Sequence, residues 1–132
     1  MQRLQTRPQF QAALAGRTLA RTAHFALHCC PLAVIGAPVQ SESVLPLFPH
    51  DGVWLGALVP KRWAKRAVTR NAIRRQIYSL SSELETTLAP QVHVVRLRAA
   101  FDRIQYVSAT SDALKRAVRI ELQQLFARAV GA

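Results

Sequence analysis

A run of seven apolar residues, Val53 to Val59, constrains the fold of this chain more than any other segment. Gly52 precedes the run and Pro60 follows it, so the segment has the length and the borders of a short strand. Because no charged or polar residue interrupts the run, we expect this strand to be buried on both faces.

A helix and another strand are predicted to follow this buried strand. Residues 67–84 have helical periodicity. Their apolar stripe, which would face the core, consists of Ile73, Ile77, Leu80 and Leu84. Pro90 interrupts the helix, and residues 91–98 read as a strand. The order strand, helix, strand marks a βαβ unit and a mixed or partly parallel sheet.

A short helix and a strand are predicted before this unit. Residues 7–16 favour a helix, because Pro8 suits a first helical turn and Gly16 is placed to end it. Residues 22–30 alternate in a way typical of a strand with two usable faces. Residues 31–51 contain four prolines and are predicted to be a loop, with a short extended piece near residues 44–48.

The last predicted element is an amphipathic helix that begins at Ser111 or Asp112 and extends to Ala129. Its apolar side carries Leu114, Val118, Leu122, Leu125 and Phe126. The predicted fold class is therefore α/β (α+β-like), with residues 1–132 as a single domain. A central mixed sheet of about three to four strands and three helices would follow the order α-β-β-α-β-α.

The charge balance limits the partners of this domain. The 132 residues contain 18 Lys plus Arg against 7 Asp plus Glu, a formal net charge of +11, which attracts polyanions. No apolar run approaches the ~20 residues of a spanning helix, so nucleic acid is favoured over a membrane. The only cysteines, Cys29 and Cys30, are neighbours, which favours the reducing cytoplasm over secretion.

Residues 61–75 contain seven cations and no acid. At about 100° per residue, one broad helical arc would carry Arg70, Asn71, Arg74 and Arg75. Guanidinium groups match phosphate oxygens with paired hydrogen bonds, and Asn can bond sugar or base edges. The alternative is an ordinary solvated face, but such faces normally mix signs so that charges pair. We therefore expect this arc to bind phosphates.

No self-contained active site is evident in the sequence. Its seven acids are scattered, and no convincing carboxylate pair is present. Cys29, Cys30, His24 and His28 could suggest a metal cluster, but adjacent strand residues point to opposite faces. Flat side chains that could stack on unpaired bases include Phe10, Phe25, His28, Trp63 and Tyr78. Core packing is the alternative for these aromatics, and for Phe25 it is the favoured one.

The motif Ala67-Val-Thr-Arg-Asn-Ala-Ile-Arg-Arg75 and the preceding Val59-Pro-Lys-Arg62 resemble the signature of one protein family. Arg3-Leu4, Phe10, Gly16-Arg17 and His24-Phe25 also follow its pattern, so the resemblance covers nearly the whole chain. On these residues the chain resembles the protein subunit of bacterial ribonuclease P, the ribonucleoprotein that removes 5′ leaders from precursor tRNA.

The resemblance implies two RNA contacts, no catalytic residue in the protein, and Mg²⁺ held mainly by the RNA. The implied partners are the catalytic RNA subunit and precursor tRNA, with no membrane and no obligate protein partner. The implied contacts to the catalytic RNA are Lys61, Arg62, Lys65, Arg66, Arg70, Asn71, Arg74 and Arg75. The implied cleft for the single-stranded leader is lined by Phe10, Leu14, Phe25 and His28. The family fold also implies a left-handed βαβ crossover.

The chain departs from the family pattern in its signature helix. Ala72 stands where the signature has a third basic residue, and Tyr78 and Ser79 replace a usual Arg-Glu pair. The same charge pattern would also suit a ribosomal or assembly protein that binds structured RNA without an associated enzyme. Only a ribonuclease P subunit should bind precursor tRNA more tightly than mature tRNA.

Overall fold

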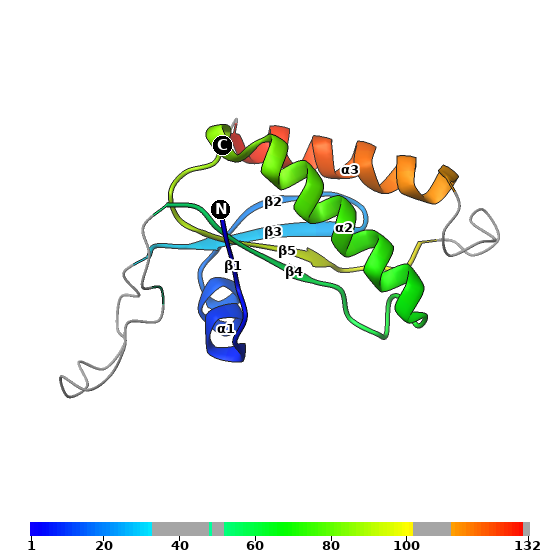
Figure 1. Cartoon of the computed structure of the whole chain (residues 1–132), viewed down its shortest axis with the longest axis horizontal. Helices are drawn as coiled ribbons and strands as arrows, with labels where there is room; N and C mark the ends of the chain where they lie inside the picture. Colours follow the sequence, from blue (N-terminus) through cyan, green and yellow to red (C-terminus); the bar gives the residue numbers. More distant parts are fainter. Residues whose placement is uncertain (33–47, 49–51, 102–111, 131–132) are drawn as a thin grey trace.

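A five-stranded mixed sheet lies at the centre of the computed structural model, which describes residues 1–32, 48, 52–101 and 112–130. The strands are β1 (Gln2–Arg3), β2 (Arg17–Arg21), β3 (Phe25–Cys30), β4 (Trp54–Leu58) and β5 (Val92–Leu97). The helices are α1 (Arg7–Ala15), α2 (Ala67–Glu83), α3 (Asp112–Val130) and the short 3₁₀ helix η1 (Glu85–Thr87). Helices α2 and α3 lie together on one side of the sheet, and α1 lies alone on the other (Figure 1).

The order of the strands across the sheet is β1-β4-β5-β3-β2. Strands β4 and β5 pair in parallel and are joined through α2, which confirms the predicted βαβ unit. Strand β1 is parallel to β4, whereas β3 is antiparallel to both β5 and β2. The mixed sheet is thus confirmed, and the handedness of the crossover stays a prediction.

The sheet has more strands than the sequence predicted. Strand β1 spans only two residues, too few for any periodic signal. Strand β2 lies at the sheet edge, where only Ala20 is buried, and a bulge between Thr18 and Ala20 breaks its alternation. For these reasons the sequence pattern did not predict either strand. The extended piece predicted near residues 44–48 lies outside the described residues except for Phe48.

The main core lies between the sheet and the two long helices. On α2, the predicted stripe is confirmed at Ile73, Ile77 and Leu80, which are at most 2 % exposed, whereas Leu84 is partly buried. All five predicted core residues of α3 are buried in the same cluster. The strands contribute alternate residues, such as Leu55 of β4 and Val95 of β5.

A smaller apolar cluster fills the opposite side of the sheet under α1. It includes Ala13 of α1, Trp54 of β4 and Val92 and Val94 of β5, with Phe48 packed edge-on against Trp54. Because α1 has nine residues, it covers only part of this face (Figure 1). Beyond α1, this face carries polar and charged side chains, described below.

One carboxylate fastens α3 to the turn between β2 and β3. Glu121 accepts hydrogen bonds from the Thr22 hydroxyl at 2.6 Å and from the backbone N–H of His24 at 2.7 Å. Its other oxygen lies 2.7 Å from the His24 ring, which stacks on Phe101. Arg128 of the same helix donates to the carbonyl of Arg21. The hairpin and the last helix therefore form one unit.

Candidate nucleic-acid interface

The polar face of α2 borders an open pocket that β1 completes. Three of its lining residues carry guanidinium groups: Arg74 and Arg75 from α2, and Arg3 from β1. The guanidinium carbon of Arg3 lies 4.1 Å from the centre of the Tyr78 ring, within range of a cation–π interaction. The complete lining is Arg3, Asn71, Arg74, Arg75, Tyr78, Ser79 and Ser82.

This pocket, which we call the α2 pocket, contains hydrogen-bond donors suited to phosphate oxygens. Arg74 donates to the side-chain oxygen of Asn71 at 3.1 Å, which orders both side chains. The backbone N–H of Ala57 donates to the Tyr78 hydroxyl at 3.3 Å and fixes the ring that supports Arg3. Among the described residues, no acid lines the pocket, so its cations are not neutralised there. Phosphate is the chemistry that fits this donor set.

Arg3 supplies the third guanidinium group of the α2 pocket, whereas Ala72 is not part of its lining. The sequence pattern placed Arg3 in the family resemblance but not among the RNA contacts. Its contribution depends on the parallel pairing of β1 with β4, which no local pattern reports. Tyr78, a departure from the signature, is the residue that positions Arg3.

Arg70 has a structural role that the sequence did not reveal. Its guanidinium group donates to the carbonyls of Ala64 and Lys65, at 3.0 and 2.8 Å, and its side chain is half-buried. Arg70 therefore holds the loop before α2 against the helix. Of the other residues of the predicted arc, Asn71 and Arg75 are exposed and Arg74 is partly buried at the pocket, and their phosphate contacts stay a prediction.

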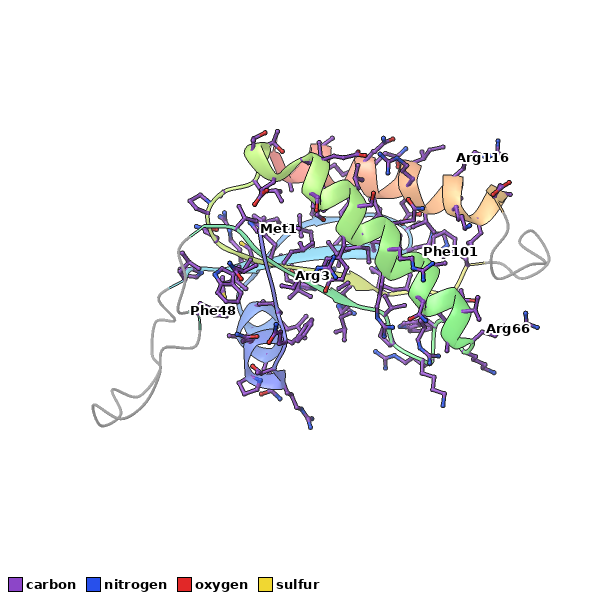
Figure 2. The ribbon with its side chains drawn as sticks, in the orientation of Figure 1. Met1, Arg3, Phe48, Arg66, Phe101 and Arg116 are labelled. Atoms are coloured by element: carbon purple, nitrogen blue, oxygen red, sulfur yellow. The ribbon has the colours of Figure 1, made fainter. Side chains whose placement is uncertain are left out.

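The four cations before α2 are all exposed. Arg66 is the N-cap residue of α2, at the end of the helix labelled in Figure 2. Arg62 lies over the ring of Trp63, with its guanidinium carbon 5.2 Å from the ring centre. Trp63 itself is half-buried and packs against the main core, so it is a support for Arg62 rather than a free stacking surface. The other two cations are Lys61 and Lys65.

Three of the residues predicted to line the leader cleft, Phe10, Leu14 and His28, lie on the α1 side of the sheet, and Phe10 is the best-placed aromatic among them. Phe10 is partly exposed and packs on the smaller cluster. A Cβ on Gly56 would lie 2.6 Å from the Phe10 ring and 2.7 Å from Leu4, so only glycine allows Phe10 to approach β4 this closely. Leu14 packs on the same cluster and is partly buried.

Phe25 is a correction to the predicted cleft. It is 0 % exposed and belongs to the main core, on the α2 and α3 side of the sheet. A ligand on the α1 side cannot reach it, because successive residues of a strand point to opposite faces. Core packing, the favoured alternative for Phe25, is the correct interpretation.

His28 faces the α1 side, but it is only 6 % exposed. Its Nε2 accepts a hydrogen bond from Nε of Arg96 at 3.2 Å, and its Nδ1 lies 3.2 Å from the Thr18 hydroxyl. Since an arginine Nε can only donate, the ring proton must reside on Nδ1. Burial, together with the charges of Arg96 and Arg21, lowers the pKa of His28. The ring is thus neutral and edge-bonded, not open for stacking.

Four arginines lie around this part of the sheet, and only Arg62 is among the predicted RNA contacts. Burial lowers the pKa of Arg96, and the charges of Arg98, Arg21 and Arg62 lower it further. Arg98 donates to the carbonyls of Thr22 and Ala23, but Arg96 bonds only His28 among the described residues. Arg96 lies two residues after Val94 on the predicted strand, so the two side chains share one face of the sheet. This spacing is the sequence feature from which the position of Arg96 could have been predicted.

Neither a metal cluster nor a membrane-spanning helix was found in the described part of the chain. There, no group of three or more His, Cys, Asp or Glu side chains is arranged to hold a metal ion. Mg²⁺ prefers oxygen ligands, chiefly carboxylates and phosphates. We therefore assign no Mg²⁺ ligand to these residues. No described helix is both long and apolar enough to cross a bilayer.

The fold and the cations gathered around α2 define a small, strongly basic α+β protein. The family model for ribonuclease P matches residues 1–129. The ribonuclease P protein component of Bordetella petrii is 35 % identical over 126 residues, covering 96 % of this chain and 89 % of that protein. That of Ralstonia pickettii is 33 % identical over 124 residues, covering 94 % and 76 %. The chain belongs to the ribonuclease P protein family, the protein components of a ribonucleoprotein endoribonuclease that processes tRNA.

A solved structure agrees with this assignment at the level of the fold. The Staphylococcus aureus RNase P protein superposes with a TM-score of 0.64 at 17 % identity, covering 96 % of this chain and 93 % of that one. These similarities support the ribonuclease P interpretation and give no support to the ribosomal or assembly alternative.

Proposed function

We propose that this chain binds the catalytic RNA of ribonuclease P through the α2 pocket and the 5′ leader of precursor tRNA along the α1 side of the sheet. The observation that carries the first half is the convergence of Arg3, Arg74 and Arg75 on one pocket with no acid in its described lining. The cations of residues 61–66 extend this surface along the N-terminal end of α2. Phosphate contacts of this kind position an RNA without reading its sequence.

The leader contact rests on the other side of the sheet. Phe10 offers a partly exposed ring beside a strand face that α1 does not fully cover. An aromatic side chain can stack on an unpaired base of any identity. Two RNA surfaces on opposite layers would allow one small domain to bridge its enzyme RNA and its substrate.

The protein's share of the reaction is binding and charge screening. Mg²⁺ would be held by the RNA and not by the described residues of this chain, and it would supply activation of the attacking water. The arginines and lysines of this chain reduce repulsion between the two RNAs, and the α1 side holds the leader in place. This would take place in the cytoplasm, where precursor tRNA is found.

Reconstitution tests this function directly. We expect the chain, mixed with the catalytic RNA of its host, to accelerate precursor tRNA cleavage at low Mg²⁺ and to bind precursor tRNA more tightly than mature tRNA. Equal binding of precursor and mature tRNA would refute the leader contact.

A pair of double variants tests the contact to the catalytic RNA. Arg74→Ala with Arg75→Ala removes two cations from the α2 pocket and should weaken binding to the catalytic RNA. The matched control is Lys115→Ala with Arg116→Ala, which removes two exposed cations from α3 and should leave that binding nearly unchanged. Equal losses in both double variants would show that net charge alone, and not the α2 pocket, governs binding.

A further inference from the structure

A row of four side chains crosses the sheet on its α1 side, just beyond Phe10. The strand register places Arg21 of β2 opposite Ala26 of β3, Ala26 opposite Arg96 of β5, and Arg96 opposite Leu58 of β4. The neighbouring row ends at Gly56, over which Phe10 lies. Two residues along a strand span roughly 7 Å, so one short single strand can contact both Phe10 and Arg96.

Among the described residues, the guanidinium group of Arg96 is held from one edge. Its Nε donates to His28, whose Nδ1–H is paired with the Thr18 hydroxyl. His28 and Arg96 are diagonal neighbours on adjacent strands, because His28 pairs directly with Val94. Within the described part of the chain, no acceptor is bonded to the terminal nitrogens of Arg96. Those nitrogens form the fork that suits a phosphate.

The charges around Arg96 are unfavourable for the protein alone. Arg96 is partly buried and lies close enough to Arg21, Arg62 and Arg98 for their charges to disfavour its own. The ion pairs among the described residues involve Glu83, Glu85 and Glu121, and none of them includes these four arginines. An uncompensated, partly buried cation is costly, and an anionic ligand would relieve that cost.

We propose that Arg96, oriented by His28, binds a backbone phosphate of the single-stranded RNA whose base stacks on Phe10. This inference rests on the proposed leader contact and adds a phosphate-binding residue to it. His28 is a positioning residue, since it contacts Arg96 and not the RNA. At this point of the cleft the chain recognises phosphate charge rather than a base, so the contact tolerates any leader sequence.

The direct test measures binding of a labelled single-stranded RNA to the full chain by fluorescence anisotropy. A probe of about eight nucleotides spans a site of this type. We expect Arg96→Gln to weaken binding by about fivefold or more and to reduce the slope of log K against log salt by about 0.7, the loss of one contact. Arg116→Gln, an exposed cation on α3 in the opposite layer, removes the same charge and should leave both unchanged (Figure 2).

A second probe separates phosphate from base recognition. Each member of a series of oligonucleotides of the same sequence carries one uncharged methylphosphonate linkage, at successive positions along the strand. At one of these positions the linkage should weaken binding to the normal chain. At that position Arg96→Gln should cause no further loss. Additive losses at every position would overturn the assignment of Arg96 to a phosphate.

The positioning role of His28 has its own readouts. His28→Leu removes the acceptor and should weaken RNA binding, whereas His28→Gln provides an amide oxygen for Arg96 and should restore much of it. Nitrogen-detected NMR of the free chain should show His28 protonated on Nδ1 and an Arg96 Nε–H shift that His28→Leu changes. A His28 ring protonated on Nε2 would overturn this geometry.

The outcomes distinguish this inference from the proposed function. If the normal chain binds the single strand and Arg96→Gln binds equally well, or loses no more than Arg116→Gln, the role of Arg96 is refuted and the leader contact stands. If the normal chain does not bind the single strand at all, the leader contact fails and the role of Arg96 fails with it.

Discussion

The two sides of the sheet are built from the same strands but differ in chemistry. On β3, Phe25 and Leu27 face α2 and α3 and are fully buried among apolar side chains. Ala26 and His28, which alternate with them, face the α1 side, where the neighbours include Arg21 and Arg96. One face is sealed by two long helices, and the other is covered in part by one short helix.

The difference separates stability from binding along a single strand. The covered face contains the main core, whose residues leave a cavity when they are truncated. The partly covered face holds a smaller apolar cluster, and beside it lie cations and a partly exposed ring that contribute little to folding. Changes on the two faces should therefore be distinguishable by unfolding and by RNA binding. The following expectations test that separation, from the largest effect to the smallest.

Phe25→Ala should have the largest effect and should act on folding. Removing a fully buried ring from the main core costs about 3–5 kcal/mol of unfolding free energy. Phe10→Ala, which removes the same side chain from the partly covered face, should cost clearly less. Denaturant unfolding of the two variants measures the contrast, and equal losses would show that the faces are not separate.

Salt should reduce the free energy of binding to the catalytic RNA by nearly as much as Phe25→Ala reduces the free energy of unfolding. If about five cations of the α2 pocket and its neighbouring segment contact phosphates, affinity should fall by roughly two to three decades between about 50 and 200 mM salt. The salt dependence of the dissociation constant checks this. A nearly flat response would rule out phosphate contacts as the basis of binding.

Phe10→Ala should affect the substrate more than the fold. We expect a loss of about 1–3 kcal/mol in binding precursor tRNA with a leader of several nucleotides, because one base loses its stacking partner. Binding of mature tRNA, which lacks the leader, should be unchanged. Equal losses for both RNAs would identify Phe10 as a packing residue only.

Arg70→Ala and Arg74→Ala should have different effects on stability, although both residues lie on α2. Arg70 donates two hydrogen bonds to loop carbonyls, so its removal should lower the unfolding free energy by about 1–2 kcal/mol as well as altering RNA binding. Arg74 bonds only the exposed Asn71 among the described residues, so its removal should weaken RNA binding with little change in stability. Thermal unfolding of both variants decides this, and an equal loss in both would contradict the assigned roles.

The smallest expected effect is a dependence of stability on pH. Burial lowers the pKa of His28 and of His93 in the folded chain, so the unfolded chain takes up these protons first. The unfolding free energy should therefore have its full value above about pH 6.5 and decline as the pH falls below it. His28→Gln should make that decline shallower in urea titrations between about pH 7.5 and 5.5. An unchanged slope would show that His28 does not contribute.

Local pattern was enough to predict the elements that form the core. The apolar run of β4, the stripe of α2 and the periodicity of α3 each report burial through side chains that follow one another in the chain. The family resemblance also predicted that the polar face of α2 contacts RNA. These features depend on short-range order, which the sequence displays directly.

The parts that could not be predicted depend on pairing between distant segments. Arg3 enters the α2 pocket only because β1 pairs with β4, and Arg96 meets His28 only through the register of β5 with β3. The hydrogen bonds from Arg70 to the carbonyls of Ala64 and Lys65 depend on the path of the loop before α2. Phe25 was placed in the cleft by resemblance, although its own alternation with His28 assigns the two to opposite faces.

The bonds of Glu121 have a consequence for the order in which the chain folds. The hairpin of β2 and β3 is complete within the first 30 residues, but the carboxylate that bonds its turn is 97 residues away from His24. Contacts so distant in sequence close late, because the intervening chain must first be ordered. During synthesis the N-terminal half must therefore wait for α3 to leave the ribosome. Until then the apolar side of β3 lacks the cover that α3 provides, and exposed apolar strand surface of this kind favours aggregation.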